Sequence, residues 1–204
     1  MRPGALSLAL FFLLELAFVG CALRPAPQDA FYRVEVDPPA RVLEQPALSG
    51  ILEVGALRAD PLTGGRAMLY RSAASSTEIR RHPYSYWIDA PTSMVQAELA
   101  AYARAAAAAE RVVTPAVRAN PDFALSGRIL HLERISGEAP GVLIEMELSV
   151  VERGNRQLLL FEVYREELST RSTRVEDAVD AFGRGLSTIF KQFLSDLAAA
   201  RRGA

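Results

Sequence analysis

Apolar and polar residues alternate along the second half of the chain, and the alternation predicts antiparallel strands. In residues 142–150 the side chains at even-numbered positions are all apolar, which puts them on one inward face of a strand. The RGNR stretch at 153–156 contains glycine and asparagine, which accept a positive φ at low cost, so it predicts a hairpin turn. On the return strand we expect Leu159, Phe161 and Val163 to face inward.

Earlier strands are predicted by the same alternation, although less regularly. They are expected at residues 31–36, 50–58, 67–71 and 123–135. Residues 76–88 (STEIRRHPYSYWI) either continue the sheet or cover its edge, and the pattern leaves both readings open.

In two other segments apolar residues recur every three or four positions, which predicts amphipathic helices. The first covers residues 93–109, opens with an S-x-x-Q capping box and ends in a run of alanines. The second opens with the T-x-x-E capping box that starts at residue 173, and its apolar stripe continues to residue 197. Gly183 and Gly185 within this helix are expected to allow close packing.

The order of strands, helix, strands and helix predicts an α+β fold, a mostly antiparallel sheet with two amphipathic helices packed on one face. With 204 residues the chain suits one domain, which we expect to comprise residues 31–204. Two prolines and no periodicity in residues 22–30 indicate a tether that precedes this domain. The apolar stripe of the last helix is expected to cover the sheet, and the alternative is that part of it contacts a partner.

An apolar run near the N-terminus predicts an export signal in residues 1–20. Residues 5–19 are apolar except for Ser7 and Glu15, and they follow the single positive side chain of Arg2. The run is short for a membrane-spanning helix, which needs about 20 apolar residues.

Cys21 is the only cysteine of the chain and directly follows this run. The FVGC stretch that ends there resembles the bacterial lipobox, in which the cysteine is diacylated, the signal is cut before it and the new N-terminus is acylated. We therefore expect Cys21 to carry a lipid anchor, with residues 21–30 as lipidated cysteine and tether. Several acyl chains on one residue anchor a protein stably, at about 0.8 kcal/mol per buried methylene. The alternative is a buried cysteine within an ordinary cleavable signal.

Ala22 occupies the position that sorts such proteins in enterobacteria. There an aspartate retains the protein at the inner membrane, so by resemblance an alanine predicts the periplasmic face of the outer membrane.

The charge balance gives no reason to expect nucleic acid as a partner. Lysine and arginine total 23, aspartate and glutamate 24, and the formal net charge is −1. A protein that binds the phosphate backbone needs a basic surface, so this class is not favoured.

Motifs for catalysis are also missing from the sequence. His82 and His131 lack a partner at metal-ligand spacing, and there is no nucleophile elbow, P-loop or dinucleotide-binding glycine motif. The Glu166 and Glu167 pair is typical of a solvated strand face. We therefore expect no catalytic residue, no metal site and no cofactor.

Tyr84, Tyr86 and Trp87 form the densest aromatic cluster of the chain. One interpretation is that they pack the first helix against the sheet. The other is that they form a partner contact, because tyrosine and tryptophan are enriched at interfaces. On a strand, Tyr84 and Tyr86 would share one face.

Several segments together resemble the ABC-type transport auxiliary lipoproteins, a family whose members include the paraquat-inducible protein C-like lipoproteins. The resemblance rests on Cys21 with its short tether, on FYRVEV at 31–36, on LSGRILHLE at 125–133, and on the terminal hairpin and helix from GNRQLLLFEVYREEL onward. It extends over nearly all of the chain that follows Cys21.

This resemblance implies a component of the Gram-negative envelope. Its partners would be a mammalian-cell-entry (MCE) domain substrate-binding protein, a permease and an ATPase, in the transport of phospholipid or other hydrophobic molecules between membranes. The lipoprotein would dock the MCE assembly at the outer membrane and would hydrolyse nothing. The resemblance also allows a ring of copies of the lipoprotein.

Two other classes stay open on the sequence. One is a different outer-membrane accessory lipoprotein, which assists lipopolysaccharide assembly or activates a peptidoglycan synthase. The other is an envelope enzyme without a recognisable motif.

Overall fold

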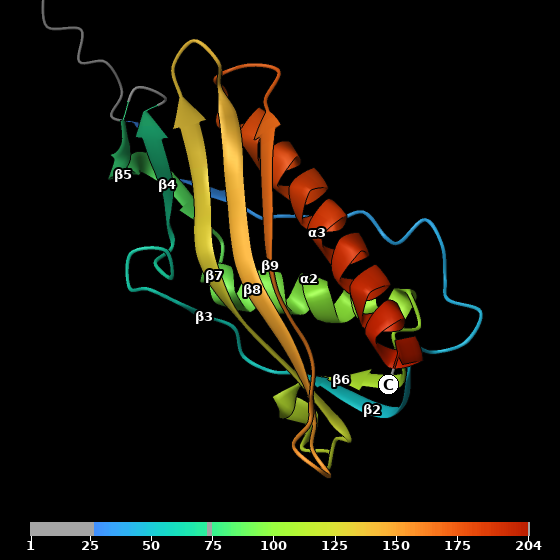
Figure 1. Cartoon of the computed structure of the whole chain (residues 1–204). Coiled ribbons are helices and arrows are strands. Elements are labelled where there is room, and N and C mark those ends of the chain that lie inside the picture. The colour runs from blue at the N-terminus through green and yellow to red at the C-terminus, as the bar shows by residue number, and fades with distance from the viewer. Residues whose placement is uncertain (1–26, 73–74, 204) are drawn as a thin grey trace, which may run out of the picture.

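The computed structural model describes residues 27–72 and 75–203, and this part of the chain forms nine strands and two long helices (Figure 1). The elements in chain order are β1 (Ala30–Tyr32), β2 (Leu48–Val54), β3 (Arg58–Ala59), β4 (Ala67–Ser72), β5 (Ser75–Trp87), α2 (Pro91–Ala105), β6 (Ala109–Val113), the 3-10 helix η1 (Pro115–Val117), β7 (Phe123–Ser136), β8 (Gly141–Glu152), β9 (Leu158–Ser169) and α3 (Val175–Gly203). Neither helix described here is both long and apolar enough to span a membrane.

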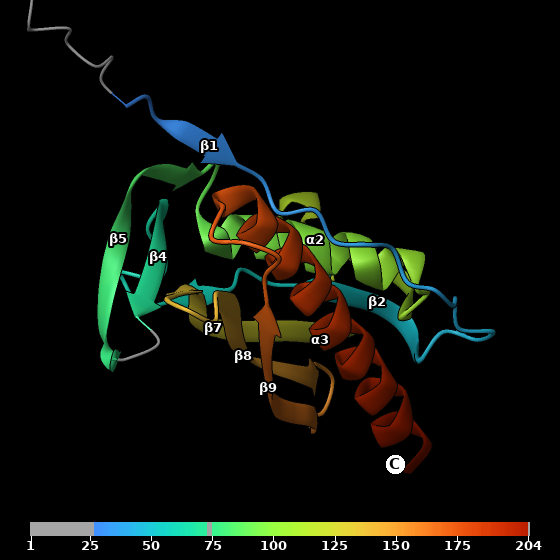
Figure 2. The same ribbon diagram turned by 90° about the horizontal axis from the view of Figure 1, so that it is seen from above.

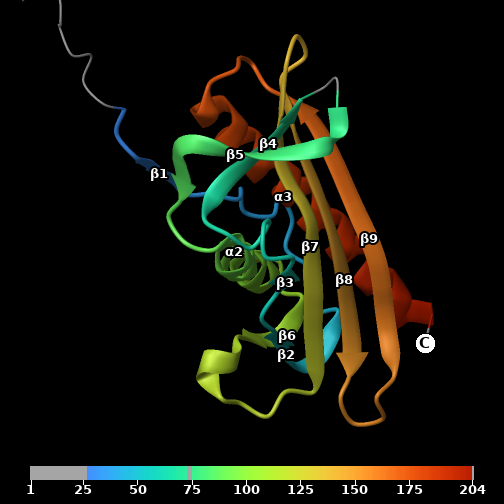
Figure 3. The same ribbon diagram turned by 90° about the vertical axis from the view of Figure 1, so that its left-hand side faces the viewer.

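Strand β7 lies at the centre of the sheet. On one edge it pairs antiparallel with β8, and β8 pairs antiparallel with β9. On its other edge it pairs parallel with β2, β3 and β4 in succession. The sheet is completed by β6 beside β2, by β5 antiparallel to β4, and by β1 parallel to β5 (Figure 3). The predicted α+β class is confirmed, and most paired residues belong to antiparallel ladders. Of residues 76–88, all but Ile88 continue the sheet as part of β5.

Both helices pack on one face of the sheet and share a single apolar core with it (Figure 2). Helix α3 contributes three aromatic rings that each make an edge-to-face contact with another element. The three pairs are Trp87 of β5 with Phe182, Tyr102 of α2 with Phe190, and Tyr164 of β9 with Phe193, at centroid distances of 5.4, 5.6 and 6.2 Å. The stripe of α3 therefore covers the sheet, as predicted.

The inward face predicted for β8 is confirmed, whereas on β9 only Leu159 packs against the core as predicted, and Phe161 and Val163 do not. On β8 the even-numbered residues 142–150 are almost completely buried. The hairpin register pairs these residues with even-numbered residues of β9, so Leu160 and Tyr164 turn inward. Phe161 and Val163 are 54% and 48% exposed on the opposite face. A register that differs by one residue exchanges the faces of a whole strand, and the turn rather than the apolar pattern sets it here.

Helix α2 begins and ends earlier than predicted. It starts at Pro91, its N-cap residue Ala90 makes no side-chain cap, and the Gln96 side chain donates to the Val54 carbonyl instead of closing a capping box. It ends at Ala105, because Ala107 adopts a left-handed φ of 55° and the chain then enters β6. The alanine run that favours helix by propensity is thus divided between helix and strand by tertiary pairing.

Helix α3 begins near its predicted start, with a different cap. The Ser172 hydroxyl accepts the Arg174 backbone N–H at 3.1 Å and donates to the Asp177 carboxylate.

The predicted close packing at the helix glycines is confirmed. A Cβ on Gly183 would overlap the backbone oxygen of Glu35, and a Cβ on Gly185 would lie 2.5 Å from the Ile144 side chain.

Candidate functional site

The three residues predicted as partner contacts lie at the end of β5 but differ in exposure. Tyr84 is 46% exposed, Tyr86 is half-buried and Trp87 is 1% exposed. Tyr84 adopts a left-handed φ of 58°, which interrupts the alternation of side chains along the strand. Of the two interpretations of Trp87, its position matches packing in the core.

The parallel pairing of β1 with β5 sorts four aromatic side chains onto two faces. Phe31 is in register with Tyr86, and Tyr32 with Trp87. Trp87 points into the core, where its ring contacts Phe182. Phe31 and Tyr86 lie on the opposite face with their ring centroids 5.8 Å apart, and Phe31 is 56% exposed.

A cation lies over the exposed Phe31 ring. The Arg66 guanidinium carbon lies 5.4 Å from the Phe31 centroid, within cation–π range, and Arg66 Nε donates to the Trp87 carbonyl at 3.1 Å. Ile88 follows the end of β5 and is 45% exposed. We call Phe31, Arg66, Tyr86 and Ile88 the aromatic edge. Phe31 carries no signal of this contact in the sequence, because only the strand pairing brings it to Tyr86.

A second exposed apolar surface lies on β9, at the other end of the sheet. Leu158, Phe161 and Val163 are 57%, 54% and 48% exposed, and we call them the β9 strip. Farther along the same face, the Arg165 guanidinium pairs with the carboxylates of Glu145 and Glu167. Within the described chain β9 pairs only with β8, so its second edge carries no strand. The interpretation of Phe161 and Val163 as inward-facing concealed this surface at the sequence level.

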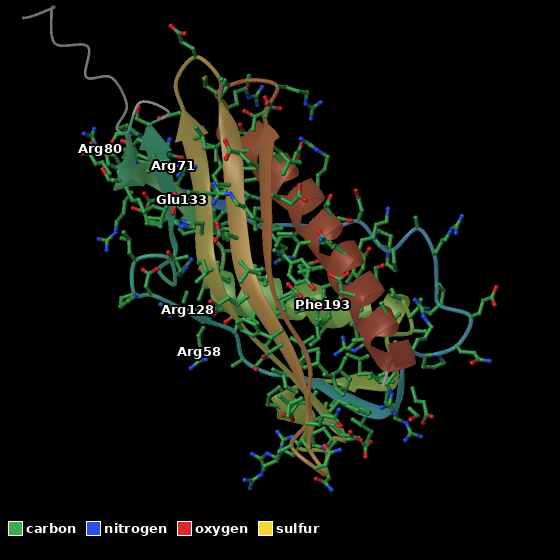
Figure 4. The ribbon with its side chains drawn as sticks, viewed as in Figure 1. Arg58, Arg71, Arg80, Arg128, Glu133 and Phe193 are labelled. Atoms are coloured by element: carbon green, nitrogen blue, oxygen red, sulfur yellow. The ribbon has the colours of Figure 1, made fainter. Side chains whose placement is uncertain are left out.

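Glu133 is a buried charge on β7, with 1% exposure (Figure 4). Its Oε1 lies 2.7 Å from His131 Nδ1, and its Oε2 lies 3.8 Å from Arg71 Nε without a hydrogen bond in the described chain. A buried carboxylate needs such partners to offset its lost hydration. The arrangement ties β4 to β7, and it explains His131 as a structural residue.

Tyr164 combines burial with a carboxylate partner on the core side of β9. Its hydroxyl donates to Asp196 of α3 at 3.0 Å. Burial in the first place, and then the hydrogen bond to Asp196, raise the pKa of Tyr164 well above its usual range. Deprotonation of this phenol would place two negative charges next to each other in a largely apolar surrounding. The pair therefore fastens α3 to the sheet while the phenol is neutral.

No group of three or more histidine, cysteine, aspartate or glutamate side chains able to hold a metal ion occurs in residues 27–72 and 75–203.

One open hollow of about 460 Å³ is lined by residues 57–61, Gly64, Gly65 and Thr92. Asp60 organises its rim by accepting hydrogen bonds from the Thr63 backbone N–H, the Thr63 hydroxyl and the Leu62 backbone N–H, which lower the pKa of its carboxyl. Cys21, the predicted lipidation site, lies outside the described residues.

The family model for the ABC-type transport auxiliary lipoprotein component matches residues 32–193. The chain belongs to this family. Its members are auxiliary components of ABC-type transport, which agrees with the predicted resemblance, and the lipoprotein class places the family on a membrane. No curated protein matches the chain in sequence.

Solved structures share the fold of this family member at low sequence identity. The protein XCC0632 from Xanthomonas campestris is 14% identical with a TM-score of 0.75, and the alignment covers 85% of this chain and 97% of that one. An uncharacterized protein, also 14% identical, has a TM-score of 0.60 over 84% of this chain and 97% of its own. These likenesses establish the fold alone.

Proposed function

We propose that the chain is a membrane-anchored accessory lipoprotein of an MCE-type ABC transport system. In this role it docks the periplasmic MCE-domain substrate-binding protein, which works with a permease and an ATPase, for transport of lipids or other hydrophobic molecules between membranes. The family match over residues 32–193 carries the proposal. The lipobox-like stretch before Cys21 supports the anchor.

The anchor in this proposal is Cys21, acylated after removal of residues 1–20. The tether of residues 21–30 then links the bilayer to the periplasmic domain, residues 31–204. At about 3.5 Å per residue, nine residue steps from Cys21 to Ala30 span roughly 30 Å at most. Ala22 after the cysteine favours the periplasmic face of the outer membrane.

We place the contact with the MCE-domain protein at the β9 strip. In the sheet order β9 is separated from β1, where the tether arrives, by β8, β7, β4 and β5. At about 4.8 Å per strand this puts the strip about 24 Å along the sheet from the anchored end. Its exposed apolar side chains, rimmed by charge, are typical of an interaction surface.

Affinity purification of the intact lipoprotein from mildly crosslinked cells tests the pathway. We expect mass spectrometry to identify an MCE-domain protein together with its permease and ATPase. Recovery of a lipopolysaccharide-assembly or peptidoglycan-synthase protein in their place would contradict the proposal.

Labelling of cells with a radioactive fatty acid tests the anchor independently. The wild-type chain is expected to take up label, and Cys21→Ala is expected to lose it. An unlabelled wild-type chain would contradict lipidation.

A further inference from the structure

We propose that the aromatic edge, formed by Phe31, Arg66, Tyr86 and Ile88, seats the domain on the bilayer surface beside the lipid anchor. The inference rests on the proposed lipidation of Cys21. It adds a second, non-covalent membrane contact, and it assigns the exposed part of the predicted aromatic cluster to lipid.

The strand pairing holds these side chains away from the core. Phe31 and Tyr86 share a face because their residues are in register, while Tyr32 and Trp87 occupy the core side of the same two strands. Phe31 is 56% exposed and belongs to an edge strand that pairs only with β5 in the described chain. The core therefore gives no reason for this ring to be aromatic.

The chemistry of the aromatic edge fits the interfacial layer of a bilayer. Aromatic rings are enriched at the boundary of headgroups and acyl chains, where the Tyr86 hydroxyl can stay hydrated while its ring is buried. Arg66 lies over the Phe31 ring, and a guanidinium there can bind lipid phosphate while its stem lies along apolar surface. Ile88, two residues after Tyr86 in the sequence and 45% exposed, adds aliphatic area at the end of β5.

The short stretch of sequence between Cys21 and the aromatic edge favours the bilayer over another partner for this surface. Pro27 is the first described residue, and β1 with Phe31 starts only three residues later. Six residue steps separate Pro27 from Cys21, a reach of about 20 Å at full extension. An acylated Cys21 thus holds the aromatic edge near the headgroups at high effective concentration, which makes even a weak contact effective.

Tryptophan quenching in proteoliposomes tests this contact on the full lipidated protein. The chain is reconstituted into vesicles of phosphatidylethanolamine and phosphatidylglycerol, with or without bromine on the acyl chains close to the headgroups. Phe31→Trp and, as a second reporter, Ile88→Trp add a fluorophore at the aromatic edge. Val117→Trp is the matched control, because Val117 is 60% exposed in η1. This short helix directly follows β6, which lies at the opposite end of the strand order from β1 (Figure 3). Trp87 is buried in all three variants and gives a constant background.

We expect brominated lipid to quench the tryptophan at position 31 and at position 88 but not at position 117. Equal emission in both vesicle types at positions 31 and 88, with the protein still floating with the vesicles, would overturn the membrane contact and leave the anchor intact. Quenching at position 117 instead would overturn it by showing the opposite orientation. A wild-type protein that does not float with the vesicles would overturn both this contact and the proposed anchor.

Discussion

Trp87 links β5 to α3, and its burial predicts the effect of its removal. Trp87→Ala would delete a ring that is 1% exposed and packs on Phe182. Removal of a buried aromatic ring costs about 3–5 kcal/mol, since both its transfer free energy and the cavity count. We expect a loss of this size in the free energy of unfolding, measured by urea denaturation.

The neighbour of Trp87 on the opposite face is the control for this prediction. Tyr86→Ala is expected to cost about 1 kcal/mol, because it removes a half-exposed ring and its contact with Phe31. An undiminished free energy of unfolding in Trp87→Ala, together with lost partner binding, would instead support the interpretation of Trp87 as a contact residue.

The raised pKa of Tyr164 predicts a loss of stability in alkali. An unfolded tyrosine has a pKa of about 10 and the folded Tyr164 a higher one, so the unfolded chain releases this proton first as the pH rises. The contribution of Tyr164 is therefore complete below pH 10 and is lost progressively above it. Tyr164→Phe cannot lose the proton, so we expect its free energy of unfolding to fall less than that of the wild type above pH 10. Urea denaturation at a series of pH values measures this difference. An equal fall in the free energy of unfolding of the two proteins above pH 10 would refute the role of Tyr164 in the alkaline loss of stability.

At the scale of single elements, periodicity predicted strands and helices better than it predicted their faces and ends. The even-numbered face of β8 follows from its sequence because that strand is covered on one side by α3. Phe161 and Val163 alternate just as regularly, yet the hairpin register turns them outward. Ala107 closes α2 with a positive φ that no propensity for helix would predict.

The aromatic edge was beyond sequence analysis for a related reason. Tyr86 was singled out by its local aromatic cluster, whereas Phe31 lies in a separate segment with an ordinary alternating pattern. The parallel register of β1 with β5 joins them, and parallel pairing between distant segments leaves no local signal in the sequence.

The close approach of Gly183 in α3 to the backbone of Glu35 predicts that an alanine at position 183 lowers the stability of the fold. In an exposed helix, glycine to alanine raises stability by about 1 kcal/mol. At Gly183 the added Cβ would overlap the Glu35 carbonyl oxygen, and backbone atoms yield poorly, so we expect Gly183→Ala to lower the free energy of unfolding by about 1–3 kcal/mol. Gly154→Ala is the matched control, because nothing lies within 4 Å of its added Cβ. A stabilised Gly183→Ala protein would show that the segment shifts freely away from α3.

At the scale of the whole molecule, the two exposed apolar surfaces lie at opposite ends of one continuous sheet. The aromatic edge lies on β1 and β5, and the β9 strip lies beyond β7 and β8. The core beneath is common to both ends, because the rings of α3 contact β5, α2 and β9 in turn. A domain held at the first end by lipid would therefore present the second end to the periplasm as a rigid surface.

This arrangement predicts that partner binding and membrane attachment can be separated by mutation. Phe161→Glu places a charge on the β9 strip, where the side chain is 54% exposed, so the cost to folding is expected to be within about 0.5 kcal/mol. Burial of that charge against an apolar partner surface would go uncompensated, so we expect the recovery of the MCE-domain protein in affinity purification to fall at least about tenfold, equivalent to about 1.4 kcal/mol. Val117→Glu, at 60% exposure in η1, controls for surface charge alone. Equal recovery with Phe161→Glu and Val117→Glu would move the docking surface away from β9, whereas loss of vesicle flotation in Phe161→Glu would show that the two ends do not act independently.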